Sequence, residues 1–174
     1  MSKRGGEFET LADLVSDIGS DAAKFFFLMR KTNAHLDFNL TLARTESDEN
    51  PVYYVQYAHA RICSVISYAE KEGVCFPDEL SCIKMLDEKE EMELIRNLVV
   101  FPNLLEGAAI SAEPHRLSGY AQQLAASFHR FYHVCRIISN DKDLSQARLL
   151  LAEATRIVLA ETLHLLGIST PERM

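Results

Sequence analysis

The chain has 174 residues, of which 48% are hydrophobic and 25% are charged, a composition that is typical of a globular domain and excludes a disordered chain. Its 18 basic and 25 acidic side chains give a net charge of −7, which by itself argues against a nucleic-acid partner, because phosphate binding needs a basic surface. No apolar run reaches the roughly 18 residues of a membrane-spanning helix, and the first residues lack the apolar stretch of a secretory signal.

The acidic charge is confined to one part of the sequence. Residues 1–100 hold 11 basic and 18 acidic side chains, whereas residues 101–174 hold seven of each. Residues 72–93 alone carry eight acidic and two basic side chains. A neutral or basic face that binds nucleic acid is therefore still compatible with the rest of the chain.

The N-terminal part of the chain predicts short helices. A capping box that begins at Thr10 predicts a helix that stops at Gly19. Ser20 can cap a second short helix directly after it. Residues 33–39 are expected to form a connector, and a further short helix is expected over residues 40–46.

A long helix is predicted between Asn50 and Gly73. Asn50 is a favourable N-cap, and Pro51 suits the first turn, where its missing N–H costs nothing. Apolar residues then recur at steps of three and four, the spacing of one buried helix face. Gly73 ends the pattern, and residues 74–86 are expected to form a loop or a broken turn.

Three more helical segments follow. One is expected over residues 88–112, with a kink or break at Pro102. The others are expected over residues 114–138 and 144–166. The predicted fold class is therefore all-α: an antiparallel bundle of about four long helices, preceded by a short and mostly helical segment.

Neither the cysteines nor the histidines predict a metal site. The four cysteines form no CxxC pair, and without a secretory signal they are expected to be reduced, small apolar fillers. His129 and His133 have a spacing that could hold zinc, but HExxH is absent and no third ligand is obviously placed. No residue set has the pattern of a nucleophile with its base, so independent catalysis is not expected.

Three segments are more specific than a helical bundle. They are MSKR at residues 1–4, NPVYYVQYAHAR at residues 50–61, and a C-terminal set with EPHRLSGYAQQLAASFHRFYHVCRI at residues 113–137 and RLLLAEATRIVLAETLHLLGISTPERM at residues 148–174. In this order and at these distances they resemble arginyl-tRNA synthetase, a class I aminoacyl-tRNA synthetase. The resemblance covers essentially the whole chain.

The resemblance implies a division of the chain. MSKR resembles the end of the KMSKS-type signature loop, and NPVYYVQYAHAR resembles the start of the helical anticodon-binding domain called DALR. Residues 1–45 would then be the end of the catalytic module and the stem-contact region, and residues 46–174 the anticodon-binding domain. The chain has no HIGH-type motif and no alternation of strands with helices. We therefore expect a C-terminal fragment that lacks the ATP and arginine site and is inactive alone.

The resemblance also implies a function. The full-length enzyme would attach arginine to its tRNA with ATP and magnesium, and this part would bind arginine tRNA on the anticodon side without a cofactor. A cytoplasmic monomer without a DNA or membrane partner is expected. Two alternatives stay open: a helical protein-interaction module without RNA binding, which the acidic residues 72–93 favour, and a stable piece of an enzyme without activity of its own.

The resemblance and the residue pattern both indicate candidate site residues. The resemblance assigns Lys3 a place beside the ATP phosphates in the full-length enzyme, with Arg4 next to it in the same loop. The first group of tRNA-binding candidates lies at one helix start and consists of Tyr53, Tyr54, Tyr57 and Arg61. Aromatic faces can stack on unpaired bases, and arginine can pair with phosphates. Alternatively, the tyrosines pack the bundle and the arginine is a structural ion-pair partner.

A second group of candidates lies on a later helix. It interleaves cationic and aromatic side chains, as a strand that is both neutralised and stacked would need, and consists of His115, Arg116, Tyr120, Arg130, Tyr132 and Arg136. The alternative is an exposed polar face, with Phe128 and Phe131 in the core. The resemblance further places the C-terminal tail at the anticodon site, with Arg173 and Met174 as contacts, the latter soft and apolar.

Overall fold

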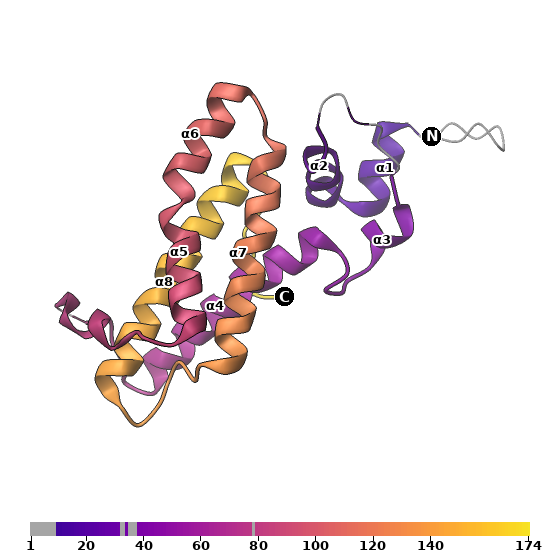
Figure 1. Cartoon of the computed structure of the whole chain (residues 1–174). Coiled ribbons are helices and arrows are strands. Elements are labelled where there is room, and N and C mark those ends of the chain that lie inside the picture. The colour runs from indigo at the N-terminus through magenta and orange to yellow at the C-terminus, as the bar shows by residue number, and fades with distance from the viewer. Residues whose placement is uncertain (1–9, 32–33, 35–37, 78) are drawn as a thin grey trace.

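The computed structural model describes residues 10–31, 34, 38–77 and 79–174, and every regular element in these ranges is a helix. In chain order they are α1 (Leu11–Ile18), α2 (Ser20–Leu28), α3 (Leu40–Arg44), α4 (Pro51–Lys71), the short 3-10 helix η1 (Leu80–Met85), α5 (Lys89–Val99), α6 (Phe101–Ser111), α7 (His115–Val134) and α8 (Lys142–Leu165). The predicted all-α fold class is confirmed (Figure 1).

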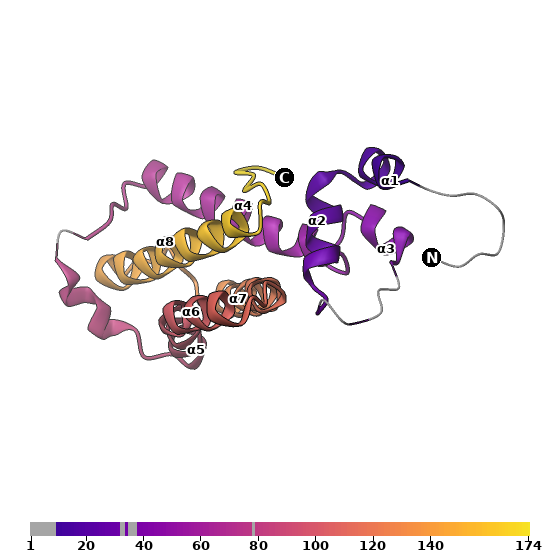
Figure 2. The same ribbon diagram turned by 90° about the horizontal axis from the view of Figure 1, so that it is seen from above.

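Helices α4, α5, α7 and α8 form the bundle, and the short helices α1, α2 and α3 lie at one side of it (Figure 1). Helix α7 packs against α4, α5 and α8, and α8 packs against α4, α5 and η1. In Figure 1, α5 and α8 run upward and α7 runs downward, so these neighbours are antiparallel. Helix α4 runs from the α1–α3 side to the far end of the bundle (Figures 1 and 2). Because α2 contacts both α4 and α7, it attaches the N-terminal helices to the bundle.

The core follows the predicted apolar spacing. Four large side chains have no exposed surface: Leu124, Phe128 and Phe131 on α7 and Leu159 on α8. The expected placement of the two phenylalanines in the core is therefore confirmed. Cys82 and Cys135 are buried as expected of apolar fillers, but Cys75 is exposed, which corrects that expectation for one cysteine. Burial raises the pKa of the Cys135 thiol to about 11. No described helix is long and apolar enough to cross a membrane.

Several helix boundaries differ from the predictions. The capping box at Thr10 is confirmed, because the side chains and backbone N–H groups of Thr10 and Asp13 bond reciprocally. Ser20, however, is the first residue of α2, and its side chain does not cap the helix; Gly19, with φ 82°, occupies the cap position. Residues 80–85 form a 3-10 helix where a loop or broken turn was expected. Pro102 lies in the first turn of a separate helix, α6.

A buried ion pair lies beside the end of α7. Arg148 on α8 donates from Nε to Oε1 of Glu91 at 2.6 Å, and Glu91 is fully buried. Nη1 of Arg148 donates to the Arg136 carbonyl at 3.0 Å. The chain can offer this carbonyl because Cys135 is extended, with φ −100° and ψ 115°. Helix α7 thus stops at Val134, directly before this extended residue, rather than continuing to residue 138 as predicted.

The same pair predicts a large loss of stability on truncation. Glu91→Ala leaves the Arg148 guanidinium buried without its carboxylate, so the free energy of unfolding should fall by about 3–5 kcal/mol, measured by urea denaturation. Glu153→Ala is the matched control, because Glu153 pairs with Arg156 in a partly exposed position and should cost about 0–1 kcal/mol. Equal losses in the two variants would contradict a structural role for the buried pair.

Candidate functional site

Arg61 lies between two tyrosines from different helices. Its guanidinium carbon is 5.0 Å from the ring centre of Tyr57 and 5.2 Å from that of Tyr132, which is cation–π geometry on both sides. Nη2 donates a hydrogen bond to the Tyr57 hydroxyl, and Nη1 donates to the Tyr132 hydroxyl at 3.4 Å. Among the described residues, no carboxylate forms an ion pair with Arg61. The interpretation as an ion-pair partner therefore finds no support.

The other two tyrosines of the first group differ from each other. Tyr53 stacks on Tyr57 with ring centres 6.2 Å apart and an angle of 6° between the planes. Tyr54 points toward α7, where its ring centre is 4.7 Å from that of His129 and packs against the core. Burial raises the pKa of Tyr54. Tyr53, Tyr57 and Arg61 thus form one continuous row of stacked side chains, whereas Tyr54 packs within the bundle.

A cavity of about 500 Å³ opens beside Arg61. Its aromatic and charged lining consists of Tyr57, Arg61, Tyr68, Tyr132 and Arg173, and the apolar Met174 side chain also lines it. Tyr68, which is 52% exposed, was not among the site residues predicted from the sequence. It lies seven residues after Arg61, two turns along the same face of α4, and that helical spacing is the signal that could have found it.

The C-terminal tail reaches this cavity because the chain reverses after α8. Gly167 adopts φ 68°, a left-handed conformation that favours glycine, and the N–H of Ile168 bonds back to the Leu163 carbonyl at 2.9 Å. The tail then runs back beside α4 (Figures 1 and 2). The carbonyl of Pro171 accepts a hydrogen bond from His59 Nδ1 at 3.0 Å. Arg173 and Met174 follow after Glu172 and line the cavity.

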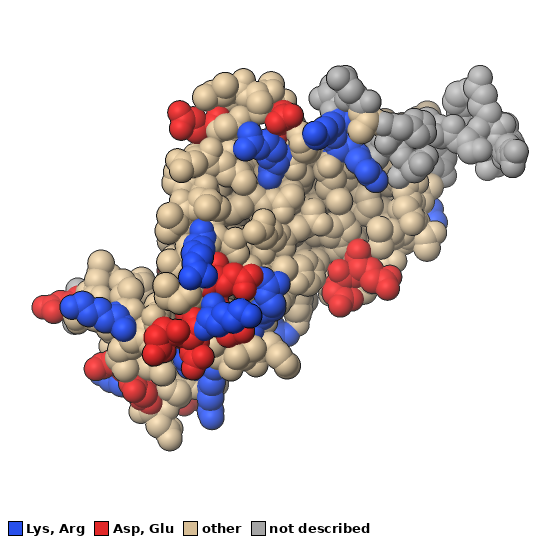
Figure 3. All heavy atoms as spheres, viewed as in Figure 1, with Lys and Arg blue, Asp and Glu red and all other residues tan. Residues whose placement is uncertain are grey.

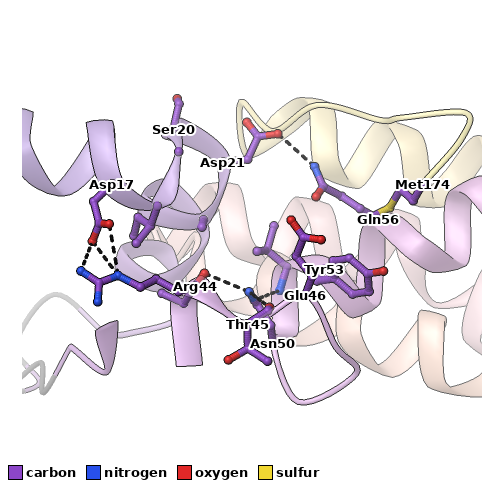
Figure 4. Close-up of a pocket in the computed structure, with 15 residues that line it drawn as sticks. Asp17, Ser20, Asp21, Arg44, Thr45, Glu46, Asn50, Tyr53, Gln56 and Met174 are labelled. Atoms are coloured by element: carbon purple, nitrogen blue, oxygen red, sulfur yellow. Dashed lines mark hydrogen bonds and ion pairs between the residues drawn. The ribbon is translucent and has the colours of Figure 1, made fainter. Parts of the chain in front are cut away.

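A second cavity, of about 620 Å³, lies between the N-terminal helices and the start of α4. Figure 4 shows the Asp17–Arg44 ion pair at one side of it and Met174 beside Gln56 at the other. Tyr53 is part of its lining. Met174 lines both cavities, so the end of the chain lies between them.

The second group of candidates is divided by the fold. Tyr132, near the end of α7, meets Arg61, but His115 and Arg116 lie in the first turn of α7, at the opposite end. The Arg116 guanidinium packs directly on the backbone of α6 at Gly107. There is no room between them for a side chain, because a Cβ atom at this position would lie 2.9 Å from Arg116 Nη1.

Tyr120 lies in the core and offers no surface for stacking. Its side chain is 3% exposed, its hydroxyl donates to the Asn97 carbonyl at 2.9 Å, and its ring centre is 5.4 Å from that of Phe101. Burial raises its pKa strongly. This placement corrects its interpretation as an RNA contact.

The remaining arginines of the second group have partners within the bundle. Arg130 pairs with Glu93 on α5, and Arg136 donates from Nε to the Ile138 carbonyl at 2.9 Å. The candidates that the fold brings together are Tyr53, Tyr57, Arg61, Tyr132, Arg173 and Met174. Lys3 and Arg4 lie outside the described residues.

The acidic residues begin where α4 ends, one turn after Tyr68. Residues 72–93 follow α4 and include η1 and the start of α5, at the end of the bundle far from α1–α3 (Figures 1 and 2). Figure 3 shows acidic and basic side chains interspersed at that end, with a broad uncharged surface above it. The charged side chains that line the cavity beside Arg61 are nevertheless both arginines, Arg61 and Arg173. No group of three potential metal ligands occurs among the described residues.

His129 is a half-buried polar residue beside the site. Its ring centre is 5.8 Å from that of Tyr57, and its Nε2 is buried without a hydrogen-bond partner. Burial lowers the pKa of His129, and the positive charge of Arg61 lowers it further. The neutral ring thus separates the Tyr57–Arg61 pair from the core.

Comparisons with known proteins agree on one family. Residues 55–174 match the model of the DALR anticodon binding domain. The whole chain is 49% identical to arginine–tRNA ligase from Moorella thermoacetica over 175 positions, which cover 31% of that protein, and 49% identical to the same enzyme from Heliobacterium modesticaldum over 179 positions, which cover 32%. The chain spans about a third of the length of these curated relatives. The solved arginyl-tRNA synthetase of Thermus thermophilus superposes with a TM-score of 0.76 and 27% identity, covering 99% of this chain and 29% of that one.

The environment of His129 predicts a pH-dependent stability. The unfolded chain binds a proton at this ring near the usual pKa of about 6.5, whereas the folded chain does so only at lower pH, so unfolding takes up a proton. This contribution to stability is fully present above pH 6.5 and is lost as the pH falls through the lowered pKa. Between pH 7.5 and 5, the free energy of unfolding should therefore decrease more steeply for the original chain than for His129→Gln.

The control for this measurement is His133→Gln, one turn further along α7 at an exposed position. It should keep the pH dependence of the original chain. If His129→Gln and the original chain show the same slope in chemical denaturation, the half-buried neutral histidine is not the cause.

Proposed function

The chain belongs to the DALR anticodon-binding domain family, and on this premise we propose that it is the part of an arginyl-tRNA synthetase that binds arginine tRNA on the anticodon side. The observation that carries the proposal is Arg61, held between Tyr57 and Tyr132 at the edge of a cavity that the chain end also lines. This arrangement joins a fixed cation, exposed aromatic edges and a soft apolar side chain.

The chemistry of unpaired RNA fits this cavity. Bases of a loop can leave the stack and lie on aromatic rings, and each such contact is worth roughly 1–3 kcal/mol. Tyr68 and Tyr132 are 52% and 38% exposed and offer such rings. Arg61 and Arg173 supply positive charge for the adjacent phosphates. A volume of about 500 Å³ is within the usual range for ligand pockets, about 300–1,000 Å³, and admits an unpaired base.

The proposal extends to the longer protein to which such a chain would belong. Its relatives are named arginine–tRNA ligases, and we infer that the longer protein attaches arginine to this tRNA with ATP and magnesium. Residues 1–45 would end its catalytic module and contact the tRNA stem, with Lys3 and Arg4 beside ATP, and residues 46–174 would bind the anticodon side. The chain has no HIGH-type motif, and without the ATP and arginine site it is expected to be inactive alone.

The alternative of a protein-interaction module without RNA binding has no support from the comparisons. The feature that favoured it, the acidic charge of residues 72–93, lies at the end of the bundle far from α1–α3 (Figure 1). The same proposal places the protein in the cytoplasm as a monomer.

The proposal is tested by binding the full chain to a transcript of arginine tRNA over a salt series. Affinity should fall as salt rises, because phosphate contacts release counterions, and a transcript with a changed anticodon should bind more weakly. The net charge of −7 predicts that binding is weak and strongly dependent on salt. Equal affinity for both transcripts together with no response to salt would contradict anticodon-side binding.

A substitution tests the residue on which the site depends. Arg61→Ala removes the cation and the hydrogen-bond donors that hold Tyr57 and Tyr132 together, so affinity for arginine tRNA should fall about tenfold, the order of one lost stacking contact. Fluorescence anisotropy measures this directly. Arg96→Ala, at an exposed position on α5, removes the same charge away from the cavity and serves as the control. Similar losses in both variants would show that only general charge is sensed.

A further inference from the structure

One carboxylate oxygen joins the C-terminal tail to the N-terminal helices. Oδ2 of Asp21 on α2 accepts hydrogen bonds from the Ser169 backbone N–H at 3.1 Å and from the Ser169 hydroxyl. It also accepts from Nε2 of Gln56 on α4 at 2.9 Å, the bond drawn in Figure 4. Three donors from two other parts of the chain thus converge on a single half-buried acceptor.

Two further contacts hold the same stretch of backbone. Nε2 of Gln56 also donates to the Ser169 carbonyl at 3.0 Å. One turn after Asp21, Lys24 donates from Nζ to the Gly167 carbonyl at 2.7 Å. Because this carbonyl follows the end of α8, the ammonium also lies at the negative end of the helix dipole. The backbone at Gly167 and Ser169 is therefore fixed by side chains of α2 and α4.

The last residues of the chain depend on these contacts. A chain end is normally frayed, and no hydrogen bond of the Arg173 side chain to a described residue is found. Met174 is 51% exposed. The hydrogen bonds that hold the tail therefore lie in the stretch from Gly167 to Pro171, and the two side chains beyond it line the cavity beside Arg61.

We propose that Asp21 and Ser169 are positioning residues for the RNA site: their hydrogen bonds anchor the tail so that Arg173 and Met174 are ordered in the cavity before RNA arrives. The inference rests on the proposed function, because it assumes that these two tail residues contact the tRNA. Its physical basis is preorganisation, since side chains that are ordered in advance do not lose that entropy on binding.

The proposal gives the N-terminal helices a role in a site that they do not line. Helix α2 contributes no residue to the cavity beside Arg61, yet Asp21 and Lys24 hold the segment that does. Packing of α2 against α4 and α7 is thereby coupled to the arrangement of the anticodon-side surface. RNA affinity should then respond to changes in α2.

The first test needs no RNA. The Ser169 N–H donates to Asp21, so its hydrogen exchange reports directly on the anchor. In Asp21→Ala, and in the milder Ser169→Ala, exchange of the amide at position 169 should become faster while exchange in α7 stays unchanged. Asp17→Ala is the control, because it removes an acidic partner of Arg44 in the same N-terminal part without touching the tail. Unchanged tail exchange in both Asp21→Ala and Ser169→Ala would overturn the proposal.

The second test measures affinity for the arginine tRNA transcript. Loss of one negative charge alone should favour RNA binding, so Asp17→Ala should bind as tightly as the original chain or more tightly. Asp21→Ala should instead bind about tenfold more weakly, the order expected when two side chains must be ordered during binding. The two acidic substitutions are thus predicted to have opposite effects.

A double variant separates positioning from general destabilisation. In a chain that lacks Arg173 and Met174, the anchor has nothing left to position, so adding Asp21→Ala should leave the affinity unchanged. An equal tenfold loss in the shortened chain would overturn the positioning role. If the original chain shows no binding that depends on anticodon or salt, the proposed function fails, and with it the tail's role toward RNA; the exchange measurement still decides whether Asp21 holds the tail.

Discussion

Helix α4 has to satisfy two environments at once. Its apolar face, with Val55 and Ile62 fully buried, packs against α7 and α8. At 3.6 residues per turn, the large polar-tipped side chains between these positions fall on the edge of that face. There they can neither enter the core nor lie entirely in water. The tyrosines and Arg61 stack along this edge, and the end of α7 adds Tyr132 to the series.

The acidic charge has a structural use at the other end of the bundle. Glu91 pairs with Arg148 in the core, and Glu93 pairs with Arg130 on the surface. These bonds join α5 to α8 and to α7. Arg130, a member of the second candidate group, therefore already has Glu93 as its acidic partner. The charged side chains that line the cavity beside Arg61 are both arginines, so an acidic chain can still present a cationic and aromatic surface.

Local signals made much of the fold predictable, and long-range contacts set the rest. The capping box at Thr10 and the Asn50-Pro51 start act within one helical turn, so they could be read directly. Just beyond the end of α7, the Arg136 carbonyl binds Arg148, which lies twelve residues further along the chain. The meeting of Arg61 with Tyr132 joins residues 71 positions apart. Tyr120 could not be placed for a similar reason, because a sequence pattern of aromatic and cationic residues does not show which ring is buried in the core.

The central claim is that the tRNA binds where α4, the end of α7 and the tail meet. The most direct measurement is an NMR titration of the full chain, labelled at its tyrosine rings, with an arginine tRNA anticodon stem-loop. The account predicts shifts at Tyr57, Tyr68 and Tyr132, with little change at Tyr120 in the core. If these three signals stay fixed while amide signals of residues 72–93 shift, the stem-loop binds at the acidic end and the account is wrong.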